Sequence, residues 1–204
     1  MTAMTTAADY AWLEDEYAFL TEAYCLTLVR DITPETLLAE LGAAATRRVT
    51  GVPGLERPSF DAWQEHGGTR LLVAAAPLGD WTLMAEINGY VGVTPSVMLP
   101  VSRSRTVVAH FRNINAVDHF YWLEDGRIQV HFEPLFPDDR DGSRPDGLLT
   151  EMRESGFVLD SDEDDEATGH TEAVFALAHR VTGIRMTPEL LNTADFSCAL
   201  VRRP

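Results

Sequence analysis

The segment WTLMAEINGYVGVTPSVMLPVSRSRTVVAHFRNINAVDHFYWLEDGRIQVHFE, residues 81–133, decides the fold class of this chain. Apolar and polar residues alternate along much of it, which is typical of β-strands with one buried face. Asn88-Gly89 and Asp125-Gly126 are dipeptides that favour two-residue hairpin turns. We therefore expect an antiparallel meander sheet of five or six strands. The expected strands are residues 70–76, 80–87, 90–93, 104–112, 117–123 and 127–133.

The region that precedes the sheet has a helical pattern. Residues 9–30 place apolar side chains at spacings of three and four, which predicts an amphipathic helix. Thr33 followed by Pro34 is a start signal for a second helix, which Gly42 would end. These two helices are expected to form an N-terminal helical hairpin.

The region that follows the sheet also predicts helices. They are expected near 148–156, 170–182 and 187–192, before a last strand at 196–201. The whole pattern predicts a single α+β domain over residues 1–204, in which the N-terminal helical hairpin and the C-terminal helices pack on the sheet. The run DSDEDDE, residues 160–166, is expected to be an acidic mobile loop.

The charge of the chain limits its partners. There are 32 acidic and 16 basic residues, a net charge of −16, and every basic residue is an arginine. The lack of lysine excludes a Schiff-base lysine. A surface this negative repels nucleic-acid phosphates and anionic lipids, so we expect a basic protein partner, with no nucleic acid and no membrane bound. No long apolar run and no signal-peptide pattern occurs, which predicts a cytoplasmic protein.

Common enzyme motifs are missing from the sequence. It contains no GxSxG elbow, HExxH helix, Walker loop or GxGxxG fingerprint. His131-Phe132-Glu133 matches the HxE fragment of zinc deaminases, but the PCxxC partner is lacking. Cys25 and Cys198 form no CxxC pair and are expected to be buried thiols, although spacing alone leaves a disulfide between them open. We therefore expect no metal and no cofactor.

The hairpin around Asp125-Gly126 carries the candidate site. With a two-residue loop and regular pairing, Phe120 would face His131 and Asp118 would face Glu133. One surface of the hairpin would then carry the polar and aromatic side chains together. Its predicted members are Asp118, Phe120, Trp122, Gln129, His131 and Glu133.

Two carboxylates that face each other repel unless a cation or a proton lies between them, and Arg112 on the preceding strand is the expected cation. The commonest explanation of this surface is a structural ion-pair group of Arg112, Asp118 and Glu133. Alternatively, Arg112, Phe120, Trp122 and His131 line a ligand-binding cleft. Two further alternatives are acid–base catalysis by His131, Glu133 and Asp118, and metal ligation by His131 and Glu133. A shift of one residue in strand pairing would change which side chains share the face.

Several segments together resemble a known family. They are INGYVGVTP, VVAHFRNINAVDHFYW, HFEPLFP, SRPDGLL and MRESGF, with TEAYCLTLVR before them and VTGIRMTPELL after them. In these segments the chain resembles an uncharacterised actinobacterial domain-of-unknown-function family, and this resemblance implies no activity. The order of elements is also similar to that of bacterial immunity proteins, at the level of fold alone.

These observations favour a non-enzymatic binding protein that engages a basic macromolecule in an immunity-protein-like or accessory role. The alternative is a small-molecule enzyme or ligand-binding domain that uses a cleft over the 104–133 sheet face, with Arg112 as an anion clamp and Glu133 or Asp118 as the base. A mimic of DNA charge is a third hypothesis. It would need carboxylates spread along one face, whereas six of them are concentrated in residues 160–166.

Overall fold

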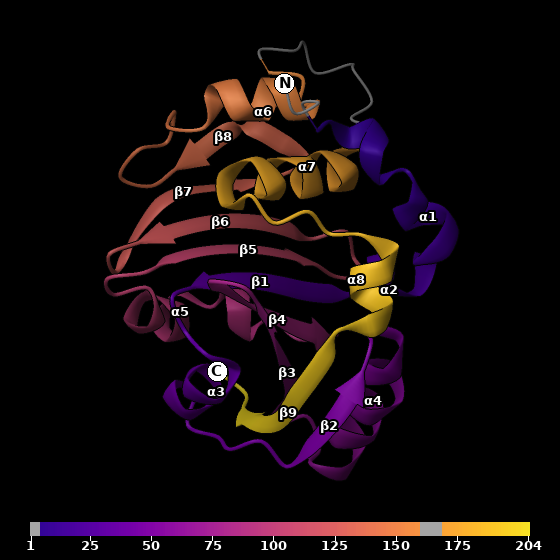
Figure 1. Cartoon of the computed structure of the whole chain (residues 1–204). Helices are drawn as coiled ribbons and strands as arrows, with labels where there is room; N and C mark the ends of the chain where they lie inside the picture. Colours follow the sequence, from indigo (N-terminus) through magenta and orange to yellow (C-terminus); the bar gives the residue numbers. More distant parts are fainter. Residues whose placement is uncertain (1–4, 160–168) are drawn as a thin grey trace.

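A computed structural model describes residues 5–159 and 169–204. Within these residues the fold is built on one nine-stranded antiparallel sheet, more strands than the five or six expected, in the order β2-β9-β3-β4-β1-β5-β6-β7-β8 (Figure 1). The strands are β1 Tyr24–Arg30, β2 Arg47–Thr50, β3 Arg70–Leu78, β4 Trp81–Ile87, β5 Thr106–Arg112, β6 Asp118–Glu124, β7 Arg127–Glu133, β8 Phe136–Asp141 and β9 Asp195–Arg202.

Helices cover both faces of the sheet, which confirms the α+β class. On one face, α1, α2, α4, α6, α7 and α8 contribute buried side chains to two apolar clusters, and on the other α3, α5 and η3 contribute to a third. Figure 1 shows α6 and α7 lying over the half of the sheet formed by β5 to β8. The helices are η1 Ala7–Tyr10, α1 Trp12–Glu16, α2 Ala18–Glu22, α3 Pro34–Glu40, η2 Pro53–Leu55, α4 Glu56–Glu65, η3 Val91–Val93, α5 Pro95–Val101, α6 Leu149–Ser155, α7 His170–Thr182 and α8 Pro188–Thr193.

The predicted single helix over residues 9–30 is wrong. The chain forms η1, α1 and α2, and then β1, which lies between β4 and β5 near the middle of the sheet. All of β1 except Arg30 is buried, so both faces of this strand are apolar and the alternation that marks a strand is lost. The predicted N-terminal helical hairpin is therefore absent, although Thr33 does cap α3 by accepting a hydrogen bond from the Thr36 amide.

The two predicted hairpin turns, at Asn88-Gly89 and Asp125-Gly126, differ in the structure. Asp125 and Gly126 both have positive φ and join β6 to β7 as predicted. Asn88 also has positive φ, but Val91–Val93, which follows it, is a 3-10 turn rather than a strand. The edge strands β2 and β8 were not predicted, because their mostly exposed residues show no apolar alternation.

Cys25 and Cys198 are buried free thiols on β1 and β9. The predicted acidic loop 160–166 falls outside the described residues. No helix in the described part of the chain is both long enough and apolar enough to cross a bilayer.

Candidate functional site

The β6–β7 hairpin has a different register from the predicted one. Leu123 pairs with Ile128 as expected, but Trp122 pairs with Val130, and Gln129 becomes an extra, bulged residue. Phe120 consequently pairs with Phe132 instead of His131. The extra residue places His131 and Glu133 on the opposite face of the sheet from Phe120 and Asp118, which corrects the predicted single polar surface.

Core packing explains the bulge. In the observed register the fully buried ring of Phe132 lies 5.1 Å from Phe120 and 5.5 Å from Phe157, measured between ring centroids. Regular pairing would point His131 into this apolar cluster. The bulged Gln129 is also held in place, because its side-chain oxygen accepts hydrogen bonds from Ser143 Oγ and Arg144 Nε.

Asp118 lies at the centre of a buried polar cluster on the face beneath α7. Its side chain is completely buried, and its Oδ2 is 3.4 Å from Arg112 Nη1. His110 Nε2 bonds to Oδ1 of the same carboxylate, and Tyr24 Oη lies 2.8 Å from His110 Nδ1. The expected Arg112–Asp118 ion pair is therefore present, whereas Glu133 is on the other face.

The electrostatics of this cluster favour a charged Asp118. Burial by itself would raise the pKa of Asp118, but His110, His170 and Arg112 together hold that pKa below its ordinary value. Burial, and then the nearby Asp118, raises the pKa of Tyr24 well above its ordinary value. Arg112 Nη1 also donates to Thr171 Oγ1 at 3.2 Å, so the cluster links the beginning of α7 to the sheet.

The predicted ligand-binding residues are not brought together in one open cleft. Phe120 is fully buried in the apolar cluster beneath α6 and α7. Trp122 is partly buried, with the Arg144 guanidinium 4.7 Å from its ring centroid. Arg112 lies in the buried cluster, and His131 lies on the other face. Ligand binding by these four residues stays a prediction.

His131 belongs to a row of side chains on the face opposite α7. Its ring stacks on Tyr121 with centroids 4.1 Å apart, and its Nδ1 is 3.1 Å from Asp141 Oδ2. His131 Nε2 lies 3.3 Å from His119 Nδ1, and burial, followed by the nearness of His131, lowers the pKa of His119. No group of three or more potential metal ligands was found among residues 5–159 and 169–204.

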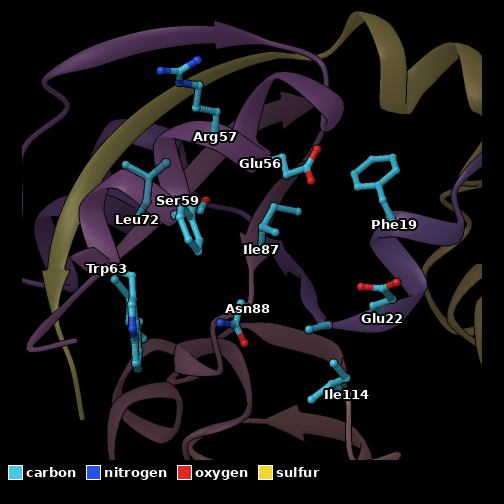
Figure 2. Close-up of a pocket in the computed structure, with 13 residues that line it drawn as sticks. Phe19, Glu22, Glu56, Arg57, Ser59, Trp63, Leu72, Ile87, Asn88 and Ile114 are labelled. Carbon is cyan, nitrogen blue, oxygen red and sulfur yellow. The ribbon is translucent and has the colours of Figure 1, made fainter. Parts of the chain in front are cut away.

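A large open pocket lies elsewhere, where α2, α4 and the beginning of β3 meet the end of β4 and the β5–β6 turn (Figure 2). Its volume is about 640 Å³, within the range of roughly 300–1,000 Å³ that ligand pockets occupy. The lining residues are Phe19, Glu22, Ala23, Glu56, Arg57, Ser59, Phe60, Trp63, Leu71, Leu72, Ile87, Asn88 and Ile114.

Local structure explains the apolar side chains in this pocket. Helix α4 uses Ala62 to pack on the core, which leaves Phe60 62% exposed and Trp63 37% exposed. Ile114 is 78% exposed in the β5–β6 turn, where Asn113 Oδ1 accepts hydrogen bonds from two turn amides. Exposed apolar side chains from separate elements thus gather at this one pocket.

The same pocket contains two carboxylates. Figure 2 shows Glu22 and Glu56 directed toward the cavity from α2 and α4, whereas Arg57 is directed away from it. Within the described part of the chain, neither glutamate has an ion-pair partner. The Arg57 side chain is 91% exposed, and its Nε lies 3.7 Å from Asp61 Oδ2.

Sequence reasoning did not find this pocket. Ser59, one of the lining residues, lies inside α4. The available signal was the pair Phe60 and Trp63, two large apolar residues that a surface helix usually turns inward. Their neighbours in the pocket come from parts of the chain that only tertiary folding brings together.

A family model matches residues 3–204, nearly the whole chain. The chain belongs to the family of unknown function DUF6461. This confirms the resemblance to a domain-of-unknown-function family. No curated protein and no solved structure matches the DUF6461 chain significantly.

Proposed function

We propose that this protein is a non-enzymatic, cytoplasmic binding protein whose partner is a basic protein, in an immunity-protein-like or accessory role. The observation that carries the proposal is the open pocket beside α4, where exposed apolar side chains lie next to Glu22 and Glu56. Burial of Phe60, Trp63 and Ile114 would supply affinity. The two carboxylates would favour a positively charged partner.

The charge of the whole chain supports the same proposal. A net charge of −16 attracts a basic protein from a distance and accelerates encounter, in a way that added salt weakens. Cys25 and Cys198 are free and buried, which suits a reducing compartment.

The alternative, a small-molecule enzyme on the 104–133 sheet face, has weaker support. Phe120, which was expected to line the cleft, and Asp118, an expected base, are both fully buried. A substrate could reach them only if the structure around them opened. Glu133, the other expected base, lies on the opposite face from both.

A pull-down from the native host tests the proposal. The protein is immobilised and exposed to lysate at about 50 mM and about 500 mM salt, on either side of the range in which surface charges become strongly screened. The control bait is an unrelated acidic protein of similar net charge, which removes partners that bind any negative surface. We expect a basic protein in stoichiometric amount on this bait alone, retained at low salt and reduced at high salt. Recovery of no stoichiometric partner at either salt concentration would contradict the proposal.

A further inference from the structure

The pocket between α2 and α4 has two chemically different sides. Trp63 stands at one side, and Glu22 lies across the cavity from it, near Phe19 (Figure 2). A ligand that spans the pocket therefore meets an apolar aromatic surface and negative charge. A flexible apolar stem that ends in a cation fits this combination.

A cation already contacts this aromatic side within the chain itself. The guanidinium of Arg203 lies 5.5 Å from the Trp63 ring centroid and 5.7 Å from the Tyr90 ring centroid. Its Nε donates a hydrogen bond to Tyr90 Oη at 2.6 Å. The Trp63 ring therefore already contacts one arginine side chain, and arginine packs on aromatic rings more readily than lysine does.

Polar groups of the pocket can also accept hydrogen bonds from a ligand. The Oγ of Ser59 is buried without a hydrogen-bond partner among the residues that the structure describes. Glu22 and Glu56 offer carboxylates, which guanidinium groups bind with paired N–H donors. Asn88, held at positive φ, adds an amide at the same pocket.

We propose that this pocket is the binding site for an arginine side chain of the basic partner protein. The inference rests on the proposed function and specifies the chemistry of its site. The aliphatic stem and a neighbouring apolar group would lie against Phe60 and Trp63. The guanidinium would lie between the carboxylates of Glu22 and Glu56.

A titration with small probes tests the pocket directly. The probes are phenethylguanidinium and its neutral analogue phenethylurea, followed by 15N NMR through the backbone amides of α4 and the indole N–H of Trp63. We expect the cation to bind about tenfold more tightly than the urea, since each of two partly solvated carboxylates contributes modestly. Added salt should weaken the binding of phenethylguanidinium and leave the binding of phenethylurea unchanged.

Charge-matched variants locate the effect. Glu22→Gln/Glu56→Gln should abolish the preference for phenethylguanidinium, whereas the control Glu14→Gln/Asp139→Asn, which removes the same charge from exposed positions outside the pocket, should keep it. Phe60→Ala changes a largely exposed side chain, so this variant should fold normally. It should bind both probes about threefold to fivefold more weakly. The indole N–H signal of Trp63 and the backbone amide spectrum, both recorded without a probe, show whether each variant is folded.

The inference and the proposed function can fail separately. Equal binding of the two probes, or amide shifts away from the pocket, would overturn the arginine site. If the pull-down nevertheless returns a basic partner that Glu22→Gln/Glu56→Gln binds as well as the wild type, the binding function stands and its site lies elsewhere. A partner lost with that variant and kept with the control supports the arginine site.

Discussion

At the scale of single residues, Glu86 is a completely buried carboxylate on β4. Its Oε2 accepts a hydrogen bond from the Val91 amide at 3.0 Å and its Oε1 accepts one from the Gly92 amide at 2.9 Å. Burial raises the pKa of Glu86 from 4.5 to about 7, and the backbone hydrogen bonds from Gly92 and Val91 limit that rise. Glu86 thus holds the turn at Val91 and Gly92 in place through hydrogen bonds, although burial makes its carboxyl group hard to ionise.

A raised pKa gives a definite direction to the pH dependence of stability. The folded protein keeps the proton of Glu86 more tightly than the unfolded chain, so stability is fully present below about pH 4.5 and is lost as pH rises through about 7. Raising the pH from 5 to 8 should therefore lower the free energy of unfolding by about 2–3 kcal/mol through the ionisation of Glu86. Urea denaturation at several pH values measures it.

Glu86→Gln separates this contribution from the histidines. Burial lowers the pKa values of His119 and His179, so both favour the folded state above pH 6.5 and oppose Glu86. The difference between wild type and Glu86→Gln should therefore change with pH, and the variant should gain relative stability toward pH 8. A difference that stays constant from pH 5 to pH 8 would show that Glu86 does not titrate in this range.

At the scale of elements, α7 is attached to β5 and β6 through the buried cluster around Asp118. Asp118→Asn keeps the shape of the side chain but removes the negative charge that faces His110 and Arg112. Breaking a buried ion pair in this way should cost about 3–5 kcal/mol of unfolding free energy. Hydrogen exchange of the first amides of α7 should accelerate as well, because Thr171 depends on Arg112 for its contact.

Asp141→Asn is the matched control for this prediction. Asp141 pairs with His131 on the other face, but its side chain is 71% exposed, so its loss should cost less than about 1 kcal/mol. Denaturant unfolding measures both variants. Equal stability losses, or an unchanged exchange rate at the start of α7, would mean that the cluster does not hold this helix.

At the scale of the whole molecule, the net charge of −16 acts against the compact state. Folding brings the carboxylates closer together, and salt screens their repulsion. Raising sodium chloride from about 20 mM to about 300 mM should raise the midpoint of thermal unfolding by roughly 2–4 °C, equivalent to about 1 kcal/mol in a domain of this size. Calorimetry measures it, and a midpoint that falls with salt would show that ion pairs outweigh the repulsion.

Features that local interactions control could be predicted from the amino-acid sequence. They include the positive-φ turn at Asp125-Gly126, the Thr33 cap and the ion pair between Arg112 and Asp118. All three depend on residues that are close in sequence or on adjacent strands. The hairpin turn at Asp125-Gly126 and the alternation along β6 and β7, where buried residues are interspersed with more exposed ones, were enough to predict an antiparallel sheet.

Long-range packing determines how these elements share one core. β1 is buried on both faces, so its sequence lacks the alternation that marks a strand, and its place beside β4 and β5 depends on contacts far along the chain. The bulge at Gln129 exists because packing selects Phe132 over His131 for the core. The pocket joins side chains of α2, α4 and the β5–β6 turn, which no local pattern brings together.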